Sequence, residues 1–484
     1  MLNTLAPGFS RAAIEELSRY KGEPEWMLQL RLQAWETYEN TSAPLGRRGD
    51  LGTLRTMAGF DFQQLRPFTP AEKGDVLPEA VQRSLQASLV NERSGLIVQV
   101  DSTVIHTELN AELAQQGVIL TDLDTAVREH ADLVREYFMT SCVPISTSKY
   151  TALHAAFWTG GFFLYIPKGV EIEAPILSQV WVDHDLASIF SHTLIIAEEQ
   201  SSVRFVEEYN STVAHEAPAL LSDVVEVFSK REGRVEFSNL QDLAQNVWNI
   251  TNKNAVYDND ASVTFVLADL GSKVNVETIG AGLKGNGSAG ELVGVFFADH
   301  EQRYIINTLS DHIGLSTNAE TLVKGVLTDR SRVEFDGMIR VRPNAQQTTS
   351  FLSAHGLLLS KGARGEFIPG LEIAANDVSA SHGATTGQID EEQLFYLMVR
   401  GISRPEAERI IVQGFFEPVL QRIPVENLRV RLRRSIISRM SGAFESEADT
   451  WVDAQERWEI EGVDEHAVKL DGRTDDEEIQ LAEY

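Results

Sequence analysis

Apolar residues follow a helical spacing in the first part of this 484-residue chain. Ser10 is placed to cap one helix, and the segment WMLQLRLQAWETY after Pro24 carries a broad apolar face. Residues 121–139 have apolar side chains every three to four positions, which predicts one helix with Thr121 as its cap. The aromatic and small residues of 150–161 predict a buried packing element. The chain therefore begins with a region that is mainly helical.

The middle of the chain changes to the short apolar runs of β-strands, which continue through residues 162–372. Strands that recur without intervening helices predict a solenoid that adds one coil at a time. A β-sandwich or jelly roll is the alternative architecture. The repeated signal is a small polar residue followed by V-x-F or its equivalent, at Val203/Phe205, Val235/Phe237, Val263/Phe265, Val293/Val295, Val333/Phe335 and Gly365/Phe367.

Four segments follow from these patterns, and together they predict a mainly β protein with helical ends. Residues 1–160 form an N-terminal helical or mixed region, and 161–389 form the β core. Residues 390–440 return to helical patterns, including a capped helix start at SRPE. Residues 441–484 carry 15 acidic and three basic residues, and we expect them to form an acidic, mobile tail.

Charge and cysteine content exclude several classes of function. The chain has 42 Lys and Arg against 71 Asp and Glu, and its net charge of -29 would repel nucleic-acid phosphates. Its one cysteine, Cys142, can form neither an intramolecular disulfide nor a private four-cysteine metal site, and we interpret it as a core residue. The sequence contains no apolar run of 18 residues that could span a membrane. We therefore expect a cytoplasmic protein.

His382 is the candidate metal-ligating residue. It lies in the segment LEIAANDVSASHGATTGQID, between the strand patterns and the next helix. The small residues around it would let another surface approach closely, although a hydrogen-bonded structural histidine is the alternative. His154, His184, His192, His300 and His355 are scattered through other parts of the chain, without the spacing of a metal site.

A solenoid enzyme that acts on polysaccharides is an alternative function from a different class. Such an enzyme needs a cluster of carboxylates along an exposed ladder of strands. Glu207, Glu208, Glu226 and Glu236 are the only hints of one, and we interpret them as solvated strand positions. A self-sufficient metalloprotein is opposed by the single cysteine.

Three segments, in order, resemble the SufB/SufD family of iron–sulfur cluster assembly scaffolds. They are SRYKGEPEWMLQLRLQAWE, YTALHAAFWTGGFFLYIPKGVEIEAPI and LLLSKGARGEFIPGLEIAANDVSASHGATTGQIDEEQLFYLMVRGIS. The resemblance covers most of the chain and stops near Met440.

Within the family, the sequence is more similar to SufD than to SufB. HGATTGQID is the SufD form, whereas SufB has HEATT, so Gly383 stands in place of a glutamate. Ala363 stands where SufB carries a cysteine in the last coil, and thiolates are the usual ligands of such clusters. Two features depart from the SufD pattern: EPEWM is similar to SufB, and Ala380 occupies a position where many SufD proteins have cysteine.

The resemblance implies a right-handed parallel β-helix core between helical terminal regions. It implies a non-catalytic SufD-type subunit that pairs with a SufB paralogue through the β-helix and docks the SufC ATPase on its C-terminal helices. His382 would then be one ligand of a transient iron–sulfur cluster shared with SufB. A SufB-like scaffold that acts as a homodimer is the alternative within the family. The isolated chain could also form a homodimer.

Overall fold

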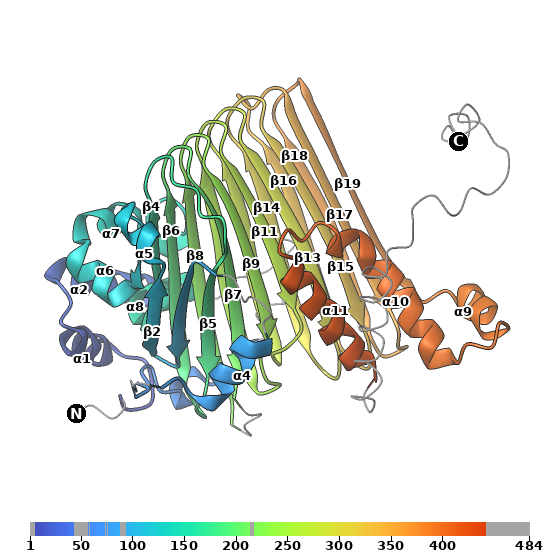
Figure 1. The fold of residues 1–484 in the computed structure, drawn as a ribbon, viewed down its shortest axis with the longest axis horizontal. Coiled ribbons are helices and arrows are strands. Elements are labelled where there is room, and N and C mark those ends of the chain that lie inside the picture. The colour runs from blue at the N-terminus through green and yellow to red at the C-terminus, as the bar shows by residue number, and fades with distance from the viewer. Residues whose placement is uncertain are drawn as a thin grey trace. The chain divides into compact units, whose positions relative to one another are not determined.

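Two long sheets form the body of the protein, as the computed structural model shows (Figure 1). The structure describes residues 5–42, 57, 59–72, 74, 76–87, 93–212 and 217–441. The first sheet has the strand order β19 (Val378–Gln388), β17 (Thr348–Leu358), β15 (Asn318–Leu327), β13 (Ala289–Ala298), β11 (Ser262–Asp269), β9 (Arg234–Asp242), β7 (Ser202–Ser211), β5 (Ile176–Val182), β1 (Gly95–Val100) and β2 (Thr103–Leu109). The second sheet has the order β18 (Arg364–Ile373), β16 (Arg332–Val341), β14 (Arg303–His312), β12 (Val274–Leu283), β10 (Val247–Tyr257), β8 (Ala219–Ser229), β6 (Ser188–Ala197), β4 (Gly160–Ile166) and β3 (Ile119–Asp122).

From β4 onward, successive strands alternate between the two sheets and pair in parallel with the strand of the previous coil. Each coil therefore contributes one strand to each sheet, as in a parallel β-solenoid. The antiparallel pairs β1–β2 and β3–β4 lie where the solenoid begins. The predicted β-helix core with helical flanks is confirmed, and the alternative of a sandwich or jelly roll is wrong.

Aromatic side chains stack between coils in the interior of the solenoid. The register pairs Phe205 of β7 with Phe237 of β9, and Phe237 with Phe265 of β11. In each of these two pairs the ring centroids are 5.7 Å apart. The predicted V-x-F repeat is in register over these three strands, and again over Phe335 and Phe367, which pair and stack with each other. Phe265 pairs next with Leu292, and the later matches at Phe335 and Phe367 belong to the other sheet.

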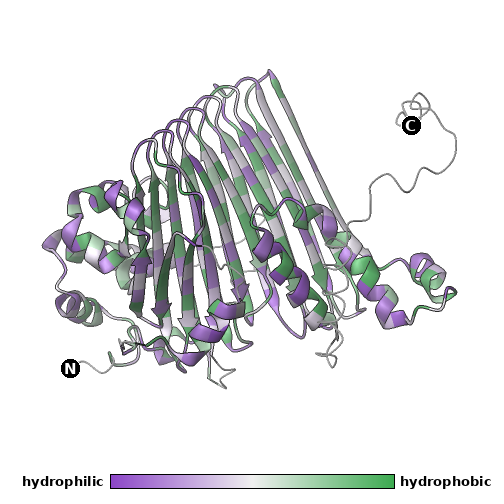
Figure 2. Cartoon of the chain, viewed as in Figure 1, coloured by the Kyte–Doolittle hydropathy of each residue, from purple (hydrophilic) through white to green (hydrophobic). Residues whose placement is uncertain are grey.

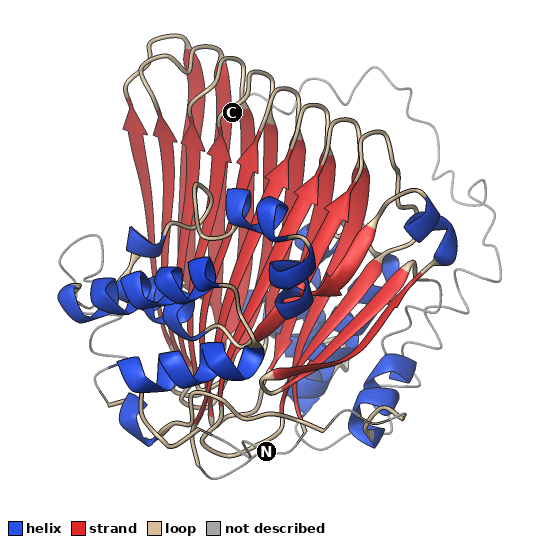
Figure 3. Cartoon of the chain, turned by 90° about the vertical axis from the view of Figure 1, so that its left-hand side faces the viewer, coloured by secondary structure: helices blue, strands red, loops and turns tan. Residues whose placement is uncertain are grey.

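Helices of the N-terminal region cover the outer face of the second sheet near its start (Figure 3). Strands β6 and β8 are buried along their whole length because this cover adds to the solenoid interior on their other face. Farther along, hydrophobic and hydrophilic residues alternate along the strands (Figure 2). The helices of the N-terminal region are α1 (Arg11–Lys21), α2 (Glu25–Asn40), η1 (Phe62–Gln64), α4 (Glu79–Ala87), α5 (Ala111–Gln115), α6 (Leu123–Glu129), α7 (Ala131–Tyr137), η2 (Ile145–Thr147) and α8 (Lys149–Phe157). Of these, α4 packs instead on β1, β5 and β7 of the first sheet, through Val81.

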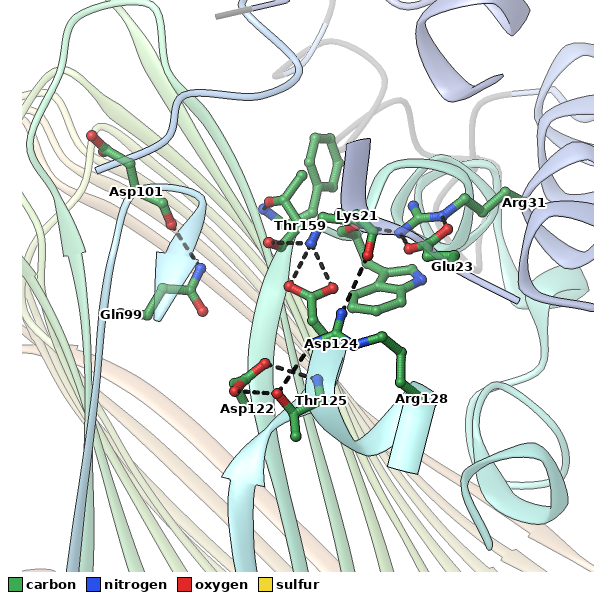
Figure 4. Close-up of polar contacts among 12 residues, drawn as sticks. Lys21, Glu23, Arg31, Gln99, Asp101, Asp122, Asp124, Thr125, Arg128 and Thr159 are labelled. Carbon is green, nitrogen blue, oxygen red and sulfur yellow. Dashed lines mark hydrogen bonds and ion pairs between the residues drawn. The ribbon is translucent and has the colours of Figure 1, made fainter. Parts of the chain in front are cut away.

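Buried ion pairs fix this helical layer to the solenoid (Figure 4). The Arg31 guanidinium, fully buried, donates to both carboxylate oxygens of Glu23 and to the carbonyl oxygens of Ala156 and Trp158. Lys21 donates to the carboxylate of Asp124 at 2.7 Å. Since a buried cation needs compensating acceptors, these contacts determine how α1 and α2 dock.

Two predictions for the N-terminal region have different outcomes. The buried packing element is confirmed, because every residue of α8 from Tyr150 to Phe157 is buried. The single helix over 121–139 is wrong. It divides into α6 and α7 at His130, whose φ of -124° and ψ of 37° are not helical, and Asp122 rather than Thr121 caps α6 through the Thr125 N–H.

The C-terminal helices are α9 (Glu391–Met398), α10 (Arg404–Leu420) and α11 (Glu426–Ser441). Helix α10 is held to the first sheet by Lys324 of β15, whose ammonium donates to the Phe415 carbonyl at 2.8 Å. The chain forms two compact units, 1–429 and 430–484, which divide within α11. The acidic segment 442–484 lies outside the described residues.

Candidate functional site at the end of the solenoid

His382 lies on β19, the last strand of the first sheet. The register places it in one ladder with Phe265, Leu292, Thr321 and Leu352 of the preceding coils. Those four side chains are at most 8% exposed, yet His382 is exposed. Its position is therefore that of a core residue, and it is open to solvent because no further described strand covers the final coil.

The inward positions of β18 are uncovered for the same reason. Leu371 and Ile373 pair with Ile339 and Val341, which are each 1% exposed, but are themselves 38% and 43% exposed. Within the described chain, β18 and β19 each have a strand partner on one side only. An uncovered sheet edge with apolar side chains is a surface to which another strand can be added.

The residues around His382 supply no second ligand of the thiolate type. Ala363, just before β18, is buried at 1% exposure, and Ala380 lies on the same face of β19 as His382, two residues earlier. A Cβ added at Gly383 would meet no atom within 4 Å, so packing does not require glycine there. The one cysteine of the chain, Cys142, is buried elsewhere, and burial raises the pKa of its thiol well above its usual value. Among the described residues, His382 is therefore the one imidazole in the uncovered core ladder at the end of the solenoid.

Helix α9 carries a second exposed surface, which we call the α9 patch: Phe395, Tyr396, Met398 and Val399. Their exposures are 67%, 56%, 41% and 63%, unusually high for neighbouring apolar side chains. The opposite face is anchored by Leu394, which is fully buried in a small core with Ile389 and Ala407. The patch therefore belongs to an ordered helix and is available for a partner.

Helix α10 connects this patch to the solenoid. Arg422, just beyond α10, pairs with Glu320 of β15 and, at 3.6 Å, with Glu291 of β13. The Lys324 ammonium also lies 4.9 Å from the centre of the Phe415 ring. These contacts couple the C-terminal helices to strands β13 and β15, on the side of the solenoid that leads to β17 and β19.

Three of the glutamates interpreted as solvated are buried. Glu207 and Glu226 are fully buried and Glu208 is 2% exposed, so that interpretation is wrong. Tyr209 donates to Glu207 at 2.7 Å, and Gln179 donates to Glu208 at 2.8 Å. The strands carry polar groups on faces that the coils or the N-terminal helices cover. Carboxylates in these positions cannot form the exposed ladder that a polysaccharide-cleaving solenoid needs.

A buried polar group that the sequence pattern did not identify lies between α8 and the second sheet. It joins His154 of α8, His192 of β6 and both Ser222 and Glu226 of β8. The two histidines are 38 residues apart. Polar residues inside nearly continuous apolar strands were the available signal, but the coil register was needed to bring them together.

No described helix is long and apolar enough to cross a membrane. The fold and the site define a class of protein: a parallel β-solenoid whose last coil is uncovered and displays one imidazole beside exposed apolar side chains. The chain matches the family described as "SUF system FeS cluster assembly, SufBD core domain" over residues 180–415, and "SufBD protein N-terminal region" over 78–179.

Relatives bearing both family names are similar over most of the chain. The iron–sulfur cluster assembly protein SufB of Bacillus subtilis is 31% identical over 445 residues, covering 90% of this chain and 94% of the relative. SufD of the same organism is 33% identical over 424 residues, covering 87% and 95%. A SufBD family protein of Staphylococcus epidermidis is 31% identical over 447 residues, covering 90% and 94%. The chain belongs to the SufB/SufD family of iron–sulfur cluster assembly proteins.

Proposed function

We propose that this chain is a non-catalytic, SufD-type subunit of a cytoplasmic iron–sulfur cluster assembly complex. It pairs with a SufB paralogue at the end of the solenoid and docks the SufC ATPase through its C-terminal helices. The observation that carries the proposal is the place of His382: a core ladder position left open at the last coil.

The uncovered strands support pairing with another solenoid. Each has backbone groups on one edge for which the described chain supplies no neighbouring strand, and Leu371 and Ile373 lose water contact when a second surface covers them. A partner with a similar open coil would extend both sheets and bury both sets of apolar side chains. His382 would then lie at the interface.

The cluster in this proposal is cargo that forms at the interface. One neutral imidazole cannot hold a cluster alone, so the remaining ligands come from the partner. An imidazole also exchanges more readily than a thiolate, which suits a site that must release its product. The alanine at 363 and the glycine at 383 favour a SufD-type role, and open space around Gly383 means that its side chain is not dictated by packing.

The α9 patch supports docking of the ATPase. Its exposed aromatic and aliphatic side chains are of the kind found at the centre of protein interfaces. We propose that closure of two docked SufC subunits moves the C-terminal helices, and that the contacts of α10 with β13 and β15 transmit this movement to the solenoid. The division into segments 1–160, 161–389, 390–440 and 441–484 corresponds, in this proposal, to cover, scaffold, docking region and tail.

A SufB-like homodimer is the second candidate, favoured by similar identities to the SufB and SufD relatives. It would use the same open coil, with two copies of His382 facing one another. Purification with and without the SufB paralogue separates the two arrangements: preference for the paralogue supports the SufD-type role, and an unchanged homodimer in its presence supports the alternative.

The ligand role of His382 is tested in the purified complex with SufB and SufC. We expect His382→Ala to assemble normally but to accumulate less iron and less cluster absorbance during anaerobic reconstitution. His300→Ala, at a turn within the solenoid, is the matched control and should behave as the wild type. If the His382→Ala complex builds clusters at the wild-type rate, the ligand role is wrong.

A further inference from the structure

Four buried side chains form a continuous hydrogen-bonded chain away from the end of the solenoid. Ser222 Oγ lies 3.1 Å from His154 Nδ1, and His154 Nε2 lies 3.3 Å from His192 Nδ1. His192 Nε2 in turn lies 3.2 Å from Glu226 Oε2. Ser222 is 3% exposed and the other three are fully buried. Each imidazole uses both ring nitrogens, so the chain has no gap.

The loop after α7 holds the carboxyl group at the inner end of this chain. The Met139 N–H donates to Glu226 Oε2 at 2.7 Å, and the Val143 N–H donates to Oε1 at 2.9 Å. Met139 has a φ of 53°, in the left-handed region that a side chain disfavours. A local backbone conformation of this kind, directed at one carboxyl group, indicates a built site for Glu226.

With both imidazoles neutral, the donor and acceptor rules allow these four side chains two hydrogen-bonding states. When Glu226 is ionised, His192 must donate from Nε2, so its Nδ1 accepts from His154 Nε2, and His154 Nδ1 accepts from the Ser222 hydroxyl. When Glu226 is protonated, every direction reverses, and both imidazoles carry their proton on Nδ1. One proton thus separates the two states, and both histidines change tautomer together.

The outer end of the chain faces a groove. A cavity of about 360 Å³ is lined by Ser148, Thr151 and His154 on the helical side and by Ser222 and Asn252 on the sheet. Asn252 is 8% exposed, yet its Oδ1 has no hydrogen-bond partner among the described residues. The lining also includes the buried Asp223, so the groove offers hydroxyl, amide and carboxyl groups to a polar molecule or water. It contacts the hydrogen-bonded side chains at Ser222.

We propose that Ser222, His154, His192 and Glu226 form a proton relay that exchanges one proton between a molecule in this groove and the buried carboxyl group. A weakly acidic O–H, N–H or S–H group in the groove gives its proton to Ser222 Oγ, which passes its own proton to His154 Nδ1. His154 Nε2 then protonates His192 Nδ1, and His192 Nε2 protonates Glu226 Oε2. The donor becomes an anion and Glu226 becomes neutral, so charge and protons balance.

The surroundings keep the imidazoles neutral while the carboxyl group changes state. Burial raises the pKa of Glu226 to about 8 and lowers the pKa of His192 to about 3. Burial, followed by the neighbouring His192 and Arg31, holds the pKa of His154 well below its usual value. Other ionisable groups facing the relay are the Cys142 thiol beside Glu226 and the Arg31–Glu23 pair beside His154.

The hydrogen bond between Ser222 and His154 has opposite directions in the two states, and this changes what Ser222 offers to the groove. With Glu226 ionised, the Ser222 proton points to His154 and its lone pairs are available to a donor. With Glu226 protonated, Ser222 accepts from His154 and can donate to an acceptor in the groove. The same hydroxyl therefore prefers different partners below and above the pKa of Glu226, which is about 8.

Imidazole ¹⁵N chemical shifts of the intact, histidine-labelled chain test the relay, with the proton itself as the probe. Between pH 6 and 9 we expect His154 and His192 to change together from Nδ1–H to Nε2–H forms without passing through an imidazolium. His312 is an internal control: it is fully buried between Thr317 and Ser350 hydroxyls, and should keep one tautomer over this range. A constant tautomer, or an imidazolium, at either relay histidine would overturn the proposal.

Two variants separate a relay from a merely structural cluster. Glu226→Gln cannot titrate, so both histidines should keep one tautomer from pH 6 to 9; a persisting switch would refute the role of Glu226. Ser222→Ala should keep the switch but slow it, giving separate signals for the two states where the wild type gives averaged ones, and Ser222→Thr should restore averaging. Unchanged averaging in Ser222→Ala would refute the link to the groove. If Glu226→Gln fails to fold, the wild-type titration remains decisive.

Discussion

Replacing Glu226 by glutamine should remove a large pH-dependent contribution to stability. Burial raises the pKa of Glu226 from 4.5 to about 8, so the folded protein binds this proton more tightly than the unfolded chain. The resulting stabilisation is complete below pH 4.5 and is lost as the pH rises through about 8. The slope of about 1.4 kcal/mol per pH unit applies only up to the folded pKa of about 8, so the loss between pH 6 and 9 comes from about two units and is roughly 3 kcal/mol. The side chain is fully buried, so solvent screening does not reduce this value.

Urea unfolding of the wild type and Glu226→Gln at pH 6 and pH 9 measures this effect. The difference in unfolding free energy should move by roughly 3 kcal/mol in favour of the variant at the higher pH. Glu232→Gln, at an exposed turn, is the matched control and should show no such movement. A difference that stays constant to within 1 kcal/mol between the two pH values, on the order of the measurement error, would refute the reasoning.

Three further predictions concern the fold and the docking surface. Arg31→Ala leaves Glu23 buried without its cation and should lower the unfolding free energy by about 3–5 kcal/mol in urea titrations; a loss below about 1 kcal/mol would contradict it. Phe237→Ala opens a cavity in the aromatic ladder and should cost about 3–5 kcal/mol in the same assay, and wild-type stability would show that the ladder is not a core. Val399→Asp should leave the melting temperature unchanged, because Val399 is 63% exposed, but should weaken SufC binding at least about tenfold in titration calorimetry; equal affinity would exclude the α9 patch.

The sequence was sufficient to predict the solenoid because strands followed one another without helices between them. It could not give the register. The V-x-F signal placed Val293/Val295 and Phe335 in one series with Phe237, whereas the structure divides them between two sheets and pairs Phe265 with Leu292. Coils of different length hide the true period, and only backbone pairing shows which residues stack.

The candidate site could be predicted only in part, because the sequence does not show the register that brings its residues together. His382 could be identified from its sequence context, but its membership of a core ladder depends on pairing with Leu352. The strand pattern predicts a solvated face for Glu226, because period-2 alternation normally leaves one face of a strand in water. Here α8 and the loop after α7 cover that face, which a strand pattern alone does not show. His154 and His192 are in contact because α8 packs on the same face of the second sheet.

The mass of the complex formed with SufB and SufC tests the central claim most directly. Native mass spectrometry of the wild-type chain should show a species that contains this chain, the SufB paralogue and SufC. Ile373→Lys, which places a charge on the open coil, should lose SufB and retain SufC, whereas Ile313→Lys, at a turn with a similar exposure of 37%, should retain both. A strictly monomeric wild-type chain, or equal SufB retention by both variants, would contradict the account.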